Sequence, residues 1–210
     1  MPIEEIWELA PTDIVDYVFL MELFKEYKQP RLKIAYLIQK GSLIRVKKGL
    51  YVLGPPYQRG MYRLEVLANL IYGPSYVSLE YALGYYGLIP ERVVEITSMT
   101  CNRNKHFNTP VGRFSYHYLH PNTYPVGVVY QTMEKGGFLM ASKEKALADC
   151  VARRTDLKSS TAVADYIVGL RIDVSELAKI SLKRMHDIAK IYQNLQVDFL
   201  QVVLKDMHHK

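Results

Sequence analysis

Cysteine is scarce in this chain: only two occur among 210 residues, Cys101 and Cys150. Neither belongs to a CxxC motif or to a Cys/His pattern with the spacing of zinc ligands, so the sequence predicts no metal site. Two isolated thiols are typical of a cytoplasmic protein whose cysteines stay reduced and partly buried.

Long apolar segments are absent as well. The most apolar run, residues 66–79, is interrupted by a Gly-Pro pair, and no stretch approaches the ~20 apolar residues that span a bilayer. The N-terminal segment carries Glu4, Glu5 and Glu8 where a signal peptide would carry Lys or Arg. The sequence therefore predicts a cytoplasmic protein with no membrane partner.

Sequence motifs of common enzymes are missing too. No GxGxxG or GxxxxGK[ST] loop is present to hold a nucleotide, and no GxSxG motif presents a serine nucleophile. The acids available for a metal-dependent nuclease are Glu65, Glu80, Glu144 and Asp149. Such a site needs several of them to converge, and Glu144 already has a reason to lie in the first turn of a helix, where its charge is favourable. We expect no enzymatic activity and no cofactor, with a nuclease as the enzymatic alternative.

Acidic residues are missing from one long segment. Residues 28–63 contain no Asp or Glu, whereas the first 26 residues contain seven. The same segment contains nine Lys and Arg residues in a chain whose net charge is +6. Because a local surplus of cations is typical of a protein surface that binds nucleic acid, we expect this segment to bind DNA. The residues predicted to contact DNA are Lys28, Arg31, Lys33, Lys40, Arg45, Lys47 and Lys48.

The pattern around this segment predicts two helices. One is expected over residues 12–27, whose first residue, a threonine, suits an N-cap. A second is expected over 30–41, because it starts with proline and stops at glycine. In the second helix Leu32, Ala35 and Ile38 would form the apolar, buried face.

A β-hairpin is expected next. Apolar and polar residues alternate over 43–47 and again over 50–53, and a Lys-Gly pair lies between them at a tight turn. Two helices and a hairpin with a cationic tip are the outline of a winged helix-turn-helix. The second helix would enter a major groove, and the hairpin would follow the phosphate backbone. Residues 3–9 would add a short helix, anchored in the core by Trp7.

The rest of the chain, residues 59–210, predicts a mixed domain after a winged domain of residues 1–58. Two helices are expected first, over 61–72 and 78–87, the second with a serine cap. A small, mostly antiparallel sheet would then occupy about 93–141. The four expected strands are 93–100, 113–119, 126–131 and 136–141.

A helical tail is expected over about 142–210. It would contain a helix that starts at residue 142 and further helices at about 159–170, 173–179, 181–193 and 195–206. The predicted fold class is therefore α+β: an N-terminal winged helix-turn-helix followed by a mixed domain with a small sheet and a helical C-terminal region.

One stretch resembles the signature of a known family. SYVSLEYALGYYGLIPE at 75–91 is similar to a motif of AbiEi-type antitoxins, which belong to type IV toxin–antitoxin modules. Three segments resemble further motifs of that family, in the same order: KKGLYVL at 47–53, TPVGRFSYHYLHP at 109–121 and ASKEKALADCV at 141–151. The resemblance covers residues 12–155, and its most specific pieces are GLIPE and EKALAD.

The resemblance implies an antitoxin with two tasks. An N-terminal winged helix would bind double-stranded operator DNA and repress the module's own promoter, with two copies on an inverted repeat. A larger C-terminal region would counter a nucleotidyltransferase-like toxin without sequestering it in a tight complex. The residues that carry the antitoxin motif are Tyr76, Ser78, Leu79, Ala82, Leu83, Gly87, Glu144, Lys145 and Asp149.

Two other interpretations stay open. Each motif residue also has the character of a packing or capping residue, which is a purely structural role. A DNA-binding regulator without a toxin, which senses a small molecule through its C-terminal domain, fits the same basic segment.

Overall fold

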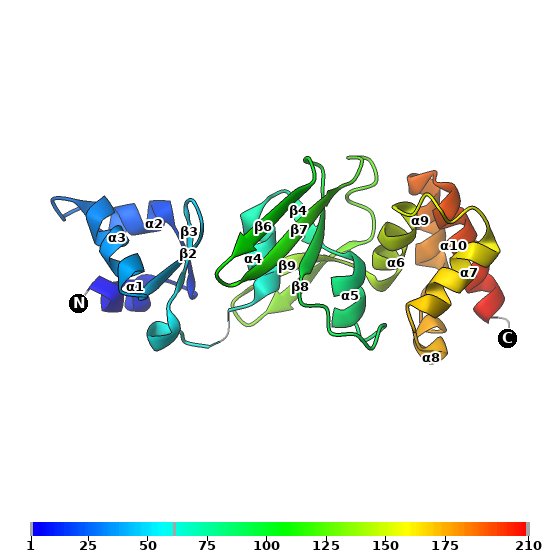
Figure 1. The fold of residues 1–210 in the computed structure, drawn as a ribbon, viewed down its shortest axis with the longest axis horizontal. Coiled ribbons are helices and arrows are strands. Elements are labelled where there is room, and N and C mark those ends of the chain that lie inside the picture. The colour runs from blue at the N-terminus through cyan, green and yellow to red at the C-terminus, as the bar shows by residue number, and fades with distance from the viewer. Residues whose placement is uncertain (1, 61, 209–210) are drawn as a thin grey trace.

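The computed structural model describes residues 2–60 and 62–208 and has a mixed α+β fold (Figure 1). Within these residues it contains ten α-helices, one 3₁₀ turn and two sheets, of three and six strands. Figure 1 shows an N-terminal unit, the larger sheet and a group of C-terminal helices following one another along the longest axis. None of the helices in the described part of the chain combines the length and the apolar composition that crossing a bilayer requires.

The N-terminal unit contains three helices and a three-stranded antiparallel sheet in the order β1-β3-β2. Its core contains apolar side chains from every helix, among them Ile6, Leu20 and Leu37. Its elements are α1 (Pro2–Leu9), β1 (Ile14–Asp16), α2 (Tyr17–Leu23), α3 (Pro30–Gln39), β2 (Leu43–Lys47), β3 (Leu50–Leu53) and the 3₁₀ turn η1 (Pro55–Tyr57).

The helix expected over residues 12–27 is present as α2 but is shorter than predicted. Its first residues form β1, because the β-branched Ile14 and Val15 pair with β3. Asp16 therefore caps α2 in place of Thr12: the Oδ1 atom of Asp16 accepts a hydrogen bond from the N–H of Phe19 at 2.7 Å. The helix also ends at Leu23, before the expected residue 27, so the connection between α2 and α3 is longer than predicted.

The short N-terminal helix expected over 3–9 is present as α1, but its anchor differs from the prediction. Trp7 is 46% exposed, and the Arg59 guanidinium lies 4.9 Å from its ring centre. Ile3 and Ile6 are buried in the core instead. They lie one helical turn apart, so a single face of α1 docks, and Trp7 falls on its flank.

Strand β3 is common to both parts of the molecule. Tyr51 and Leu53 belong to the core of the N-terminal unit, whereas Leu50 and Val52 join the core of the larger part. This division follows from the alternation of side chains along a strand. One face of the predicted wing is therefore buried against the body of the protein.

The larger sheet has the strand order β6-β7-β5-β4-β9-β8. The pairs β5–β7 and β4–β9 are parallel, and the other three pairs are antiparallel. The sheet is therefore mixed and larger than predicted. Its strands are β4 (Ser75–Val77), β5 (Ile96–Thr100), β6 (Lys105–Thr109), β7 (Gly112–Tyr118), β8 (Val128–Met133) and β9 (Gly136–Ala141).

Helices lie beside this sheet and beyond it towards the C-terminus (Figure 1). The expected helices over 61–72 and 78–87 are present as α4 (Leu64–Ile71) and α5 (Leu79–Tyr85), while Met61 lies outside the described residues. The helical tail is confirmed: side chains of Ser142, Ser159 and Ser181 cap three of its helices. Its helices are α6 (Lys143–Ala152), α7 (Ser160–Gly169), α8 (Val174–Leu177), α9 (Leu182–Tyr192) and α10 (Leu195–His208).

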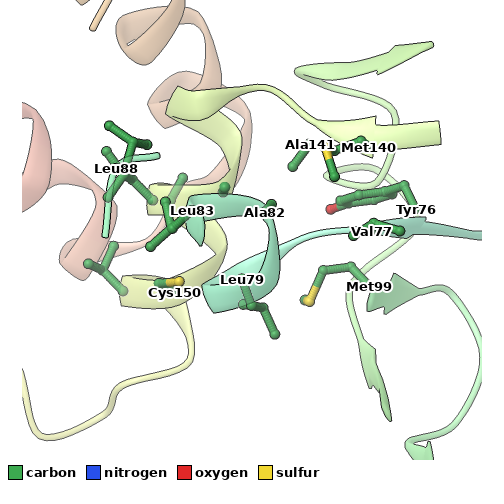
Figure 2. Packing of buried hydrophobic residues seen from close by; sticks show 14 of the residues in the cluster. Tyr76, Val77, Leu79, Ala82, Leu83, Leu88, Met99, Met140, Ala141 and Cys150 are labelled. Carbon is green, nitrogen blue, oxygen red and sulfur yellow. The ribbon is translucent and has the colours of Figure 1, made fainter. Parts of the chain in front are cut away.

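One continuous core joins the sheet to these helices. Figure 2 shows how α5 and α6 meet the sheet: Leu83 and Cys150 lie between the helices, and Tyr76, Met99 and Met140 come from neighbouring strands. All of these side chains are buried. The strand β4 and the helices α5 and α6, which carry most of the antitoxin motif, therefore lie at the centre of the larger part.

Candidate nucleic-acid interface and a buried polar centre

Helix α3 exposes one side along its whole length. Leu32 and Tyr36 are 64% and 50% exposed, while Ile34 and Leu37 are buried. The prediction that Leu32 and Ala35 face the core is therefore wrong; the helix is rotated so that its mixed side is outside. We call this exposed side the α3 face. It consists of Arg31, Leu32, Ala35, Tyr36, Gln39 and Lys40.

Aromatic rings hold the cations of α3 in place. The Lys33 ammonium lies 5.2 Å from the ring centre of Tyr27 and 5.7 Å from that of Tyr36, and the Lys40 ammonium lies 5.8 Å from Tyr36. The Nε of Arg31 donates a hydrogen bond to the Tyr17 hydroxyl at 3.1 Å. Such contacts orient a cation without neutralising it, so the positive charge remains available to a ligand.

Carboxylates do not balance these charges. The ion pairs of the described residues lie elsewhere, and none of them includes one of the seven cations predicted to contact DNA. Lys28, Arg45 and Lys48 are exposed. A surface whose cations have no carboxylate partners is complementary to a polyanion such as the DNA backbone.

Lys47 differs from the other six. Its ammonium donates a 2.6 Å hydrogen bond to the carbonyl oxygen of Ile71, at the end of α4. Partial burial lowers the pKa of Lys47, and the nearby charge of Lys105 lowers it further. Lys47 therefore joins the hairpin to the body of the protein, and its neighbour Lys48 is the lysine that the turn exposes.

Four residues of the antitoxin motif meet in a fully buried cluster. One carboxylate oxygen of Asp149 accepts hydrogen bonds from the hydroxyl of Tyr76 at 3.0 Å and from that of Ser78 at 2.7 Å. The Lys145 ammonium lies 3.7 Å from the other oxygen. Tyr192 completes the cluster: it accepts from Lys145 at 2.5 Å and donates to Asp149. We call these five residues the buried polar centre.

Further protein groups bind the Lys145 ammonium. Its ammonium also donates to the carbonyl oxygen of Thr123 at 2.7 Å and lies 4.4 Å from the ring centre of Tyr192. Burial lowers the pKa of Lys145, and the carboxylate of Asp149 acts in the opposite direction. Burial and the same carboxylate raise the pKa of Tyr76 and Tyr192, so both hydroxyls remain proton donors.

The chain leaves room for Lys145 at Gly127. A Cβ atom at Gly127 would lie 2.9 Å from the Cβ of Lys145, and the φ angle of this glycine is +71°. Both the space and the backbone conformation therefore require glycine. Local sequence signals reveal neither the need for glycine at position 127 nor the role of Tyr192, because both residues lie far from Lys145 along the chain.

The remaining motif residues build the interior around this centre. Leu79, Ala82 and Leu83 are buried in the core. Gly87 has a φ of +69° just after α5. Ser78 occupies the N-cap position of α5, but its side chain makes no capping hydrogen bond and serves Asp149 instead, so the predicted serine cap is wrong.

Two of the acids considered for a nuclease, Glu65 and Glu144, have separate protein partners. Glu65 accepts a hydrogen bond from the Tyr81 hydroxyl at 2.8 Å, and Glu144 accepts one from the N–H of Ser181 at 3.0 Å. Within residues 2–60 and 62–208, no three His, Cys, Asp or Glu side chains come together as metal ligands.

An open cleft of about 440 Å³ lies beside the junction of the two parts. Asp13 lines it and is buried: its Oδ2 accepts from the N–H of Arg59 at 2.9 Å, whereas its Oδ1 has no hydrogen-bond partner among the described residues. The cleft thus combines a carboxylate with cations. Its other lining residues include Thr12, Tyr62, Arg63, Val66, Met133, Glu134 and Lys135.

Comparison with known proteins identifies a similar fold. No protein-family model matches the sequence, and no curated protein matches it significantly. Among solved structures, the chain is similar to the crystal structure of the RV2827C protein from Mycobacterium tuberculosis. The TM-score is 0.62, with 13% sequence identity, over 99% of this chain and 79% of that chain. At this identity the similarity concerns the fold.

Proposed function

We propose that this protein is an antitoxin of a type IV toxin–antitoxin module that also binds operator DNA and represses its own promoter. The observation that carries the DNA-binding part is the α3 face, whose cations have no carboxylate partner in the described part of the chain. The element order α1-β1-α2-α3-β2-β3 supports a winged helix-turn-helix, with α3 as the helix that enters the major groove.

The α3 face has side chains suited to reading bases. Arg31 offers the bidentate donor pattern that recognises guanine, and Gln39 offers the donor and acceptor that recognise adenine. Leu32 and Ala35 present apolar atoms of the kind that contact the thymine methyl group. Around this face Lys28, Lys33, Lys40, Arg45 and Lys48 would contact phosphates and fix the orientation of the protein.

The antitoxin part of the proposal rests on the motif resemblance. The motif residues form the buried polar centre and the core around it, so their contribution would be to fix the arrangement of the sheet and the C-terminal helices. The surface that counters a nucleotidyltransferase-like toxin would then depend on that arrangement, and the two copies expected on an inverted repeat would each present it.

A double substitution on the α3 face tests whether DNA binding and toxin neutralisation depend on different parts of the chain. Arg31→Ala with Lys40→Ala should weaken binding to the protein's own upstream DNA at least tenfold and reduce the slope of log K against log salt by about 1 to 2, because fewer phosphates are neutralised. The same variant should still rescue cells that express the neighbouring nucleotidyltransferase-like reading frame. Fluorescence anisotropy and a growth assay measure the two effects.

Lys183→Ala with Lys190→Ala is the matched control, since it removes the same charge from exposed positions of α9. This control should retain both activities. Unchanged DNA affinity in the α3 variant would contradict the DNA-binding part, and failure of the unmodified chain to rescue growth would contradict the antitoxin part.

The cleft at Asp13 supports a second candidate, a regulator that senses a small molecule. The Oδ1 atom of Asp13, which has no hydrogen-bond partner among the described residues, would favour a ligand with an N–H or O–H donor. The two candidates differ in the growth assay: the regulator binds DNA in a ligand-dependent manner and gives no rescue.

A further inference from the structure

The two edges of the six-stranded sheet differ in charge. Strand β8 forms one edge and β6 the other (Figure 1). β8 reads Val-Val-Tyr-Gln-Thr-Met, without a charge or a proline, whereas β6 includes Lys105 and His106. Cationic side chains on an edge strand discourage pairing with another chain, and an uncharged edge strand permits it. Of the two edges of this sheet, β8 is therefore the more open to strand pairing.

The ladder between β8 and β9 determines which backbone groups of β8 are free. Its register runs without irregularity, and at its end the N–H of Ser142 donates to the carbonyl oxygen of Gly127 at 2.8 Å. Because hydrogen-bonding groups alternate between the two sides of a strand, those of Val128, Tyr130 and Thr132 point away from β9. No hydrogen bond within the described residues uses these outward groups.

We propose that β8 pairs antiparallel with β8 of a second copy of this chain, about a two-fold axis at Tyr130. In this register Val128 of one copy faces Thr132 of the other, and the two copies of Tyr130 face each other. Every outward residue then meets an outward residue, so the joint forms about six backbone hydrogen bonds, two for each facing pair. The same strand serves on both sides, as a symmetric dimer interface requires.

The side chains along β8 fit a second copy. Tyr130 is 58% exposed, and its ring lies across Gly137, where an added Cβ atom would come within 2.6 Å of it. This contact holds the ring on one face of the sheet, and in the proposed register Tyr130 of the second copy would project from the same face. Cross-strand aromatic pairs of this kind stabilise antiparallel sheets.

Charge also favours an identical strand as the occupant. The charged residues nearest to β8 along the chain are Glu134 and Lys135, which follow its last residue. Antiparallel pairing places the two copies of this turn at opposite ends of the joint, so like charges do not meet. Because one strand pair buries little area, we expect a concentration-dependent equilibrium.

Sedimentation of the full chain without DNA tests this proposal. From micromolar to millimolar concentration, the mass should rise from that of the monomer towards twice that value. Tyr130→Lys and Tyr130→Glu should each shift the midpoint at least tenfold upwards, since like charges would face each other across the axis. An equimolar mixture of the two variants should associate again as a heterodimer. Asn108→Lys on β6 is the control and should associate like the unmodified chain.

The mixture keeps the test decisive if one substitution loosens the fold, because regained association cannot come from unfolding. Thr132→Pro, which removes an outward N–H and leaves the β9 ladder intact, should also weaken association. A chain that stays monomeric at every concentration overturns the proposal. So does association that survives Tyr130→Lys, which would place another surface at the interface. Neither result depends on whether the protein binds DNA.

Discussion

The cations of the N-terminal unit and Lys145 illustrate two opposite uses of positive charge. Arg31, Lys40 and Lys48 are exposed and form no ion pair with a carboxylate of the described residues, so water and salt solvate them. Lys145 is fully buried and has Asp149, Tyr192 and a backbone carbonyl oxygen as partners.

The difference determines what each cation does for the protein. An exposed cation contributes little to folding and contributes to binding as one of several similar charges. A buried cation makes the fold depend on each of its partners, because any loss leaves a charge without solvent or counter-ion. Function and stability are therefore expected to be separable by mutation in this chain.

The largest effect should come from breaking the buried pair. Asp149→Ala leaves the ammonium of Lys145 buried without a counter-charge and removes the acceptor of three hydroxyl groups, so we expect a loss of about 3–5 kcal/mol of unfolding free energy. Urea denaturation followed by circular dichroism measures it. The exposed pair of Arg154 and Asp156 is the control: Asp156→Ala should cost only a small part of that loss, because solvent screens the pair. Equal losses in the two variants would show that burial does not set the strength of the centre.

Local sequence signals predicted much of the framework around this pair. The hairpin turn at Gly49, with a φ of +87°, and the starts of α6 and α9 at Ser142 and Ser181 follow from side-chain and backbone preferences within a few residues. The i, i+4 spacing of Lys145 and Asp149 also places them on one side of α6. Their complete burial has no such signal, because the covering elements come from distant parts of the chain.

The errors of prediction arise where tertiary packing overrides local pattern. Strand β4 has only three residues, and its partners β5 and β9 follow much later in the chain, so no local alternation reveals it. Helix α3 exposes Leu32 and Ala35, against the expectation that apolar residues face the core. Such an exception is expected at a binding surface, where apolar contacts are reserved for a ligand.

An intermediate effect on stability is expected from His117, which is partly buried and lies near both positive and negative charges. Partial burial, then the charges of Arg153 and His106, lower its pKa from 6.5 to about 4, against an opposing effect of Glu95. Between these values the unfolded chain binds the proton and the folded protein does not, so stability falls as the pH falls from 6.5 towards 4. We expect His117→Asn to reduce this loss by about 1–2 kcal/mol, less than the full shift implies because the ring is partly exposed. Denaturation at a series of pH values measures the slope; equal slopes in both proteins would contradict the assignment.

The smallest and most discriminating effects concern two neighbouring lysines of the hairpin. Lys47→Ala removes a partly buried donor from the carbonyl oxygen of Ile71, so it should cost about 1 kcal/mol of stability. Lys48→Ala removes an exposed charge and should leave stability within about 0.5 kcal/mol. DNA affinity should respond in the opposite order, because only Lys48 has a free ammonium for a phosphate. Thermal unfolding and DNA titration of the two single variants therefore show which lysine stabilises the fold and which one binds DNA. A larger loss of DNA affinity for Lys47→Ala would mean that the hairpin leaves the body of the protein when it binds DNA.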